Sequence, residues 1–482
     1  MFDKNDPSVL WISPQAGSGG DGTHENPFGD IGRALLIVNP GMTIVLTAGV
    51  YCRDTTFDIS GTIHQPIRIA ADPGADVEIL KACWFFYDVS DIIVSGLTFR
   101  DATAGAVSVI GACARNRFDS LRFVNCGTRD TASCTLFFGG SGGSCNMVEN
   151  CRFERAVAGT AAARDSAAAS IGLMISEGDS DGGAPLVDHV LRKNYFVNYD
   201  YGILIGTGDA PAGQYGHIVE HNTVEQCRDE GILVKCGDTT VRGNRVLRCR
   251  NHSLFIGAGR DSVVESNRIV DCGSGIQVNG DGHTVANNCI VRCGNEAIGV
   301  NGASKTQGRR AASNILVENN TCVDCGTLLG DNGSARVAGV RIDSGTTSIV
   351  RQNLFYGEGK PYTGADTTAP HNGKKSSLII ENIAAGRCEA MEGAAVAAVA
   401  FKNASGDDFT NDSGCGASGG VLTPDTFEPE VDSVDETNDY RCGRGEADEE
   451  TGEEKFPETA GEADFESFMD QFYSKGVAPK NS

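Results

Sequence analysis

The stretch HNTVEQCRDEGILVKCGDTTVRGNRVLRCRNHSLFIGAGRDSVVESNRIVDC (residues 221–272) decides the fold. In it, and again further along the chain, an Asn is followed five positions later by a Cys: Asn222/Cys227, Asn244/Cys249, Asn267/Cys272, Asn288/Cys293 and Asn320/Cys325. Successive Asn residues of this series are 22, 23, 21 and 32 positions apart. A period near 22 is too short for paired-helix repeats and suits a coil of three short strands. Because parallel crossovers are right-handed, the repeat predicts an all-β, right-handed parallel β-helix.

The strand that follows each Cys predicts which side chains face the core. Aligned coils read GILIG (202–206), GILVK (231–235), SLFIG (253–257), GIQVN (275–279), AIGVN (297–301) and GVRID (339–343). Side chains alternate along a strand, so the second and fourth positions form an aliphatic column that points inward. The third and fifth positions point outward, in vertical register about 4.8 Å apart from coil to coil. This outer strip suits a long polymer, although an ordinary solvent-facing sheet is also polar.

The eighteen cysteines raise the question of disulfides or zinc. The repeated Cys occur once per coil at the same phase, so they are expected to stack as small apolar side chains inside the solenoid. Cys322 and Cys325 form the one CxxC pair, and no second pair lies near it as a zinc site requires. The Asn series is likewise expected to be structural, with each amide bonding the equivalent Asn above and below.

The net charge and the hydropathy of the chain argue against several classes of binding partner. The formal net charge of −24 argues against nucleic acid and anionic membranes, and no apolar run approaches the roughly 20 residues needed to span a bilayer. The opening MFDKNDPS has no charged segment followed by an apolar one, so no signal peptide is expected in it. Nothing in the sequence indicates an oligomeric state.

Three regions are expected along the chain. Residues 1–52 form an N-terminal cap and first coil, with a helix over 31–39, and residues 53–404 form the β-helix. Residues 405–482 are an acidic C-terminal extension with few apolar residues. Two insertions, about 154–186 and 302–313, interrupt the repeat and are expected to project as loops.

One stretch resembles a known enzyme family. NYDYGILIG (198–206), followed by HIVEHNTVEQCRDEGILVKCGDTTVRGN (217–244), is similar to the catalytic coils of the chondroitinase B and alginate lyase family. There, a Glu precedes a Lys by five residues at the end of a strand. PGMTIVLTAGVY (40–51) also resembles that family, whereas WISPQAGSGGDGTHENPF (11–28) is more like β-helix pectate lyases. The resemblance implies an extracellular or cell-surface polysaccharide lyase that cleaves a uronate-containing glycan by β-elimination.

Residue by residue, the resemblance assigns Lys235 as the base that abstracts the C5 proton. It assigns Asn198 and Glu230 as ligands of a Ca²⁺ ion that neutralises the substrate carboxylate, and Asp229 is the nearest further carboxylate. The chemistry needs both parts, because the proton next to a carboxylate is weakly acidic and a cation must absorb the developing charge. Ca²⁺ takes hard oxygen ligands of this kind.

The sequence also departs from the family at two positions. A second family Glu is replaced by Arg228, and the family's catalytic Arg falls at Ile256, an inward position. Arg260 and His252 are the candidates to replace that Arg. Outward residues on the following coils are predicted to bind the glycan: Phe255, Gln277, Asn279, Asn301 and Arg341.

Several other functions stay open at the level of sequence. A C5-epimerase would share the proton abstraction. A glycoside hydrolase would need two carboxylates about 5–9.5 Å apart, and no such pair is evident in the sequence. A non-catalytic surface or phage-spike β-helix could bind glycans through the same strip.

Overall fold

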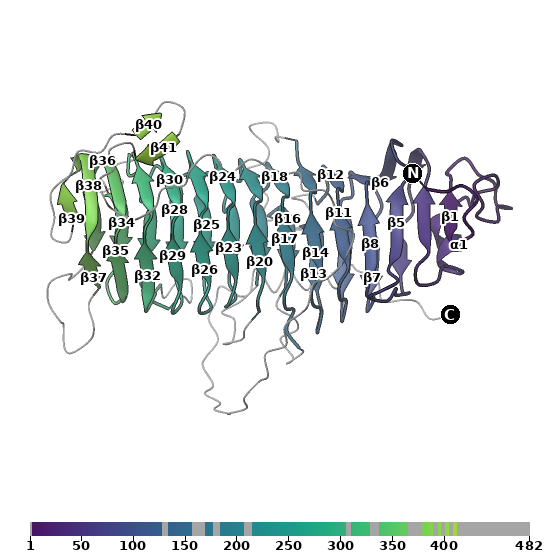
Figure 1. Cartoon of the computed structure of the whole chain (residues 1–482), viewed down its shortest axis with the longest axis horizontal. Helices are drawn as coiled ribbons and strands as arrows, with labels where there is room; N and C mark the ends of the chain where they lie inside the picture. The colour runs from purple at the N-terminus through teal and green to yellow at the C-terminus, as the bar shows by residue number, and fades with distance from the viewer. Residues whose placement is uncertain are drawn as a thin grey trace.

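The chain forms a right-handed parallel β-helix in the computed structural model (Figure 1). The structure describes residues 2–127, 134–156, 169–176, 184–206, 215–304, 310–327, 337–364, 377–388, 394–396, 401–403 and 408–411. Three parallel sheets run the length of the solenoid, and each strand pairs in parallel with the equivalent strand of the next coil. The predicted acidic extension lies, apart from the last four of these residues, outside the described part.

The strands of each sheet follow one another in chain order. Sheet A consists of β1 (Val9–Ile12), β2 (Thr43–Leu46), β5 (Ile67–Ala71), β8 (Ile92–Ser95), β11 (Arg117–Asp119), β14 (Met147–Glu149), β17 (Val190–Arg192), β20 (Ile218–Glu220), β23 (Thr240–Arg242), β26 (Val263–Glu265), β29 (Thr284–Ala286), β32 (Ile315–Glu318), β35 (Ser348–Arg351) and β37 (Leu378–Ile380). Sheet B consists of β3 (Gly49–Tyr51), β6 (Val77–Leu80), β9 (Thr98–Arg100), β12 (Arg122–Val124), β15 (Arg152–Glu154), β18 (Tyr195–Val197), β21 (Thr223–Glu225), β24 (Arg245–Leu247), β27 (Arg268–Val270), β30 (Cys289–Val291), β33 (Thr321–Val323), β36 (Leu354–Gly364), β38 (Asn382–Cys388) and β39 (Ala394–Val396).

Sheet C carries the candidate site. It consists of β4 (Thr55–Phe57), β7 (Trp84–Tyr87), β10 (Val107–Ile110), β13 (Cys134–Gly139), β16 (Ile171–Ile175), β19 (Tyr201–Ile205), β22 (Ile232–Val234), β25 (His252–Ile256), β28 (Ser274–Val278), β31 (Ile298–Val300) and β34 (Val337–Ile342). The long strand β36 joins it to sheet B, because its first residues pair with β33 and its last with β34. Two short antiparallel strands, β40 (Phe401–Asn403) and β41 (Asp408–Asn411), form a separate hairpin.

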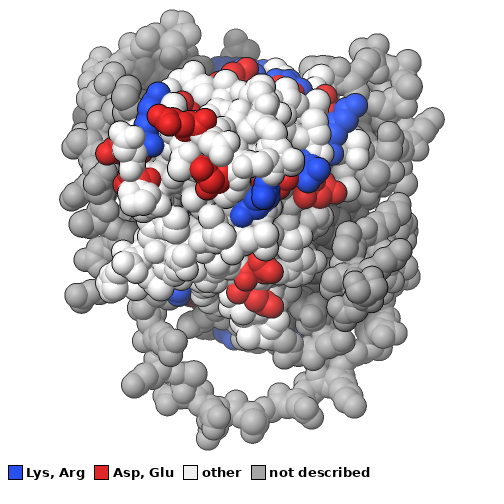
Figure 2. Space-filling view, turned by 90° about the vertical axis from the view of Figure 1, so that its right-hand side faces the viewer, with Lys and Arg blue, Asp and Glu red and all other residues white. Residues whose placement is uncertain are grey.

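The N-terminal end carries a single short helix, α1 (Ile31–Leu35), which ends four residues earlier than the sequence predicted. The Asp30 side chain caps it by accepting a hydrogen bond from the Arg33 backbone amide at 3.3 Å. Figure 2 looks onto this end of the molecule, where acidic and basic side chains are interspersed among uncharged ones.

The prediction for one of the two insertions was partly wrong. Residues 154–186 were expected to form a projecting loop, but β16 lies within them and pairs with β13 and β19. Its core residue Leu173 is fully buried. The irregular spacing of this coil therefore comes from long connections on either side of a normal rung, and a sequence period alone cannot detect such a rung.

The interior has the columns that the repeat predicted. Ile203, Ile232, Leu254, Ile276 and Ile298 stack in sheet C and are fully buried. The repeated cysteines Cys227, Cys249, Cys272, Cys293 and Cys325 are also buried, and the fifteen cysteines whose side chains the structure describes are free thiols. The phase of the Cys series therefore reflects packing.

A ladder of buried asparagines runs along the turn between sheets A and B. In each step, the Oδ1 atom of one Asn accepts hydrogen bonds from the backbone amide and the Nδ2 atom of the Asn in the preceding coil, at 2.9 or 3.0 Å. The ladder comprises Asn194, Asn222, Asn244, Asn267, Asn288, Asn320, Asn353 and Asn382. The left-handed backbone of this turn belongs to the residue before each Asn, such as His221 with φ 54°.

A second polar ladder precedes sheet A and contains buried histidines. Nδ1 of His189 accepts from the Asn146 amide at 3.2 Å, and Nδ1 of His217 accepts from the His189 amide at 3.2 Å. The Asn146 side chain fills the same role one coil earlier, accepting from the Asn116 amide at 3.0 Å. An imidazole that accepts at Nδ1 must be neutral, so the fold requires these histidines uncharged.

These histidines predict an acid-sensitive stability. Burial lowers the pKa of His217 from its usual 6.5 to about 3. Below about pH 6.5 the unfolded chain therefore binds more protons than the native one. The stability that the neutral His217 contributes is complete above that pH and is lost as the pH falls toward about 3. His217→Asn keeps an acceptor and is expected to flatten the pH dependence of the urea-unfolding midpoint. The exposed His221→Asn serves as the control, and an unchanged pH dependence in His217→Asn would contradict the prediction.

Candidate functional site

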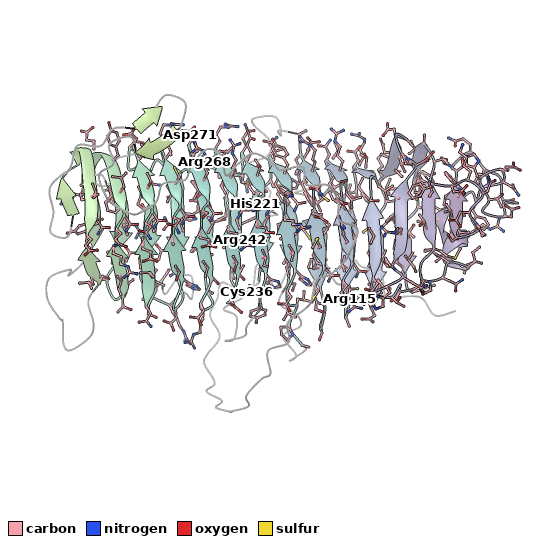
Figure 3. The ribbon with its side chains drawn as sticks, viewed as in Figure 1. Arg115, His221, Cys236, Arg242, Arg268 and Asp271 are labelled. Atoms are coloured by element: carbon pink, nitrogen blue, oxygen red, sulfur yellow. The ribbon has the colours of Figure 1, made fainter. Side chains whose placement is uncertain are left out.

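The outer face of sheet C presents three rows of side chains, which together we call the outer strip. The first row contains Tyr201, Glu230, His252, Ser274 and Glu296, the second Leu204, Leu233, Phe255, Gln277, Gly299 and Arg341, and the third Gly206, Lys235, Gly257, Asn279, Asn301 and Asp343. In Figure 3, Asp271 marks the edge of the solenoid where strands of this sheet begin, and Cys236 marks the edge where they end.

Glycines set the register of the first row. A Cβ atom on Gly231 would lie 2.7 Å from Val246 Cγ1, so this position points into the core directly before the inward Ile232. Gly202 is placed in the same way against Val224. Two successive inward positions shift the alternation, which is why Glu230 and Tyr201 face outward with Leu233 and Leu204.

The outer face of sheet C nearer the N-terminus is apolar and buried. Phe137 and Met174 pack there with Leu204, Leu233 and Phe255 of the outer strip, in a cluster separate from the core. Phe255, predicted to bind the glycan, is 1% exposed, and its ring centroid lies 5.2 Å from that of His252. Phe255 is thus at the boundary between this cluster and the polar part of the strip.

The polar part of the strip contains a cavity of about 690 Å³. Four of the five residues predicted to bind glycan are polar, and all four line it together with Phe255 and His252. Arg341 is at its centre: its Nη2 atom donates to Gln277 Oε1 at 3.2 Å and to Asn301 Oδ1 at 2.9 Å. The same atom contacts Glu296 Oε1 at 3.0 Å, and Nη1 pairs with Asp343.

Gly299 permits this network. It lies between Gln277 and Arg341 in the register, and a Cβ atom there would be 2.2 Å from Gln277 Oε1. The absence of a side chain lets the Arg341 guanidinium reach across a whole coil. Glu296 also accepts from Gln277 Nε2 at 2.9 Å, so the cavity wall is held by side chains of three coils.

His252 and Glu230 form a pair beside the cavity. His252 Nδ1 lies 3.0 Å from Glu230 Oε1, and the side-chain Nδ2 of Asn251 donates to the same oxygen at 3.4 Å. With Nδ1–H donated to the carboxylate, Nε2 is the nitrogen left for another partner. Burial, with Glu230 and Asp229 nearby, raises the pKa of Tyr201 well above its usual value, so this phenol stays protonated.

Lys235 is on the third row of the strip, one residue beyond the paired positions Val234 and Ile256. It is half-buried, and a Cβ atom on Gly257 would be 3.4 Å from its Cγ atom. Glycine at 257 thus leaves space along the Lys235 side chain. Lys235 lies five positions after Glu230, about 16 Å along an extended strand, so the two residues are on opposite sides of the strip.

The predicted calcium ligands do not form a ready-made cage. The αL residue Asn198, with φ 66°, donates its side-chain amide to the Arg155 carbonyl at 2.9 Å, while Glu230 is used by His252. The Nη2 atom of Arg228 lies 3.7 Å from Asp229, so a cationic side chain already accompanies this carboxylate. Within the described residues, no three His, Cys, Asp or Glu side chains converge on one point. Calcium binding stays a prediction.

Arg260 is placed away from the cavity. It lies in the turn that follows β25, where its guanidinium pairs with Asp281 at 3.3 Å and is largely exposed. The cavity lining does not include it.

Three residues of this region were missed by sequence reasoning. Glu296 occupies the same position in EAIGV (296–300) as Glu230 in EGILV (230–234), a signal that could have found it. Arg250 occupies the position of Arg228 one coil later. Asp200, which is fully buried beneath Arg228, occupies the position of Asp229 one coil earlier, but its ion pair with Arg228 is a contact across coils that the repeat does not reveal.

Comparison with known proteins supports the architecture. Residues 141–310 match the family model described as a right handed beta helix region. A PL6 family alginate lyase structure matches with a TM-score of 0.65 and 18% identity, covering 86% of this chain and 57% of that one. A mannuronic acid specific family 6 lyase from human gut microbiota matches with a TM-score of 0.55 and 16% identity, covering 81% of this chain and 91% of that one.

Similarity in sequence is confined to a shorter stretch. Pectate lyase L of Thermoclostridium stercorarium is 36% identical over 75 residues, 15% of this chain and 6% of that protein. The chain thus spans a small part of this curated relative and just over half of the alginate lyase above. The described residues contain no helix long and apolar enough to cross a membrane. The chain has the right-handed β-helix fold, the fold of these polysaccharide lyases.

Proposed function

We propose that this protein is a polysaccharide lyase that cleaves a uronate-containing glycan on the outer strip of sheet C. The observation that carries the proposal is the placement of Lys235 on the same strip as the polar cavity lined by Gln277, Asn279, Asn301 and Arg341. Coils about 4.8 Å apart make this strip a continuous surface for a polymer. The lyases with the same fold support the reaction class.

In the proposed reaction, the neutral Lys235 amine removes the C5 proton of a uronate. The electrons of that C–H bond form the C4–C5 double bond, and the C4–O4 bond breaks. The departing oxygen takes a proton from the new lysine ammonium or from water. Asn301 and Arg341, held by the buried Asn279 and Gln277, offer hydrogen bonds to a neighbouring sugar, and the His252 ring, packed against the buried Phe255, offers a face for a sugar ring.

The family resemblance implies a Ca²⁺ ion, which the described ligands do not surround, and an extracellular or cell-surface location. Catalysis with Ca²⁺ at Asn198, Asp229 and Glu230 would show as activity lost in chelator and restored by the metal. An extracellular or cell-surface location follows from the proposed substrate, since such polymers occur outside the cell.

A glycoside hydrolase is the second candidate, because the structure brings two carboxylates together that the sequence did not pair. Glu296 and Asp343 both contact the Arg341 guanidinium inside the cavity. Hydrolysis there would release reducing ends without any unsaturated product. A C5-epimerase or a non-catalytic glycan-binding protein would release neither.

The test is incubation with alginate, pectate, chondroitin and dermatan, with and without Ca²⁺, followed by ultraviolet absorbance of the unsaturated uronate and by a reducing-end assay. A rise in both signals supports the lyase. Reducing ends without absorbance point to the hydrolase, and no rise on any of the four polymers contradicts the proposed reaction for these substrates.

A further inference from the structure

A second recess opens next to the outer strip, on the turn that leads from sheet B into sheet C. Its volume is about 530 Å³, and it is lined by Arg228, Asp229, Arg250 and Asn251. Asp229 and Asn251 of this recess directly precede Glu230 and His252, the bonded pair whose His252 lines the first cavity. The recess therefore touches the strip at the end opposite Lys235.

Arg228 is fixed rigidly in this recess. Its Nε atom contacts Oδ1 of Asp200 at 2.8 Å. The other oxygen of Asp200 accepts from the Ser170 amide at 2.8 Å and from the Ser170 hydroxyl at 2.9 Å. A buried carboxylate whose oxygens are all used orients the guanidinium without leaving a binding site of its own.

Arg250 lies one coil further and makes no ion pair within the described residues. Its backbone amide is bonded to the Cys227 carbonyl at 2.8 Å, and its side chain is exposed. The nearby carboxylates of Asp200 and Glu230 are buried and committed to Arg228 and His252. Asp229 is thus the one acidic side chain that lines the recess, against two guanidinium groups.

We propose that Arg228 and Arg250 bind a carboxylate of the glycan directly, in the region where the family resemblance puts a calcium ion. Guanidinium groups recognise carboxylates through paired, charge-assisted hydrogen bonds. Arg228, which replaces a family Glu, adds a positive charge where a metal ligand would add a negative one. The identity of the anion as a uronate rests on the proposed function; the recess itself does not.

Substitution of Asp229 distinguishes an arginine recess from a calcium site, because the two predict opposite changes in the affinity for a carboxylate. Removing its charge with Asp229→Asn strengthens carboxylate binding at an arginine recess. The same change weakens binding that depends on calcium, because it removes a ligand charge.

The test uses the Lys235→Ala protein, which cannot turn substrate over, and isothermal titration with trisaccharides of galacturonate, mannuronate and guluronate in EDTA. Methyl esters of the same trisaccharides serve as neutral probes. We expect a free acid to bind more tightly than its methyl ester in EDTA. Adding Arg250→Gln should weaken the affinity for the free acid about tenfold, and adding Asp229→Asn should increase that affinity. Arg245→Gln, an exposed arginine on β24 of the same coil, is the matched control and should change nothing.

Arg228→Gln is a less useful variant, because it leaves the buried Asp200 without its ion pair and risks misfolding. Arg250→Gln carries no such risk. The proposal is overturned if no free acid binds in EDTA, if binding requires Ca²⁺, or if Arg250→Gln binds as well as its parent.

These results separate the recess from the reaction. Cleavage with unsaturated products, together with unchanged carboxylate binding by Arg250→Gln, would support the lyase and contradict carboxylate binding in the recess. Binding that depends on Arg250, with no unsaturated product from the Lys235-containing enzyme, would do the reverse.

Discussion

Lys235→Ala is expected to reduce eliminative cleavage by at least about a hundredfold, the lower end of what a positioned general base contributes. Lys235 lies on the outer strip and has no part in the buried aliphatic column, so the variant should fold normally. The expected result is therefore an enzyme with an unchanged circular dichroism spectrum and unfolding midpoint, and with kcat almost abolished. The ultraviolet absorbance of the product is the measurement.

Lys235→Arg distinguishes a base from a binding charge. Arginine keeps the positive charge but stays protonated at any working pH, so it cannot accept the C5 proton. A base role predicts that Lys235→Arg is as inactive as Lys235→Ala. Substantial activity in the arginine variant would show that the position serves binding only. Lys193→Ala, an exposed lysine in the turn between sheets A and B, is the control and should retain full activity.

Asn244→Ala is expected to cause the largest loss of stability, about 3–5 kcal/mol, because several buried polar groups lose their partners at once. The Asn244 side chain accepts from the Asn222 amide at 2.9 Å and from Asn222 Nδ2 at 3.0 Å. It also donates to the Val219 carbonyl at 2.8 Å. Alanine would leave these groups unsatisfied in a fully buried position.

The unfolding midpoint in urea measures this loss, and Asn150→Ala gives the matched control. Asn150 is an exposed turn residue with a side-chain bond to Asp119 at 2.9 Å, so its replacement should cost no more than about 1 kcal/mol. Equal midpoints for the two variants would contradict the role of the ladder.

The repeat predicted the solenoid because each coil makes the same contacts with its neighbours, so the residues that make them recur at a short, fixed period in the sequence. The inward column, the Cys stack and the Asn ladder all follow from residues that recur at one phase, such as Asn244 with Asn267. The outer strip followed from the same alignment. This is why Gln277, Asn279, Asn301 and Arg341 were found together before the structure placed them around one cavity.

Features that depend on contacts between unlike residues were not predictable in this way. Before the rung β16, Cys151 stands at the position that the ladder Asn occupies in later coils, and the bond between Arg228 and Asp200 joins unlike residues of two coils. The Arg341 network needs Gly299, whose role is visible only when the coils are stacked. Contacts that depart from the repeat therefore cannot be predicted from the repeat.

The measurement that tests the central claim most directly is mass spectrometry of the products from a glycan that the protein degrades. Elimination divides the polymer without adding water, so each cut should give one fragment with an unsaturated uronate at its new non-reducing end. That fragment is lighter by one water than the corresponding hydrolysis product, and it should be absent with Lys235→Ala. Fragments carrying the added water, formed equally by wild type and Lys235→Ala, would contradict the lyase and favour hydrolysis at Glu296 and Asp343.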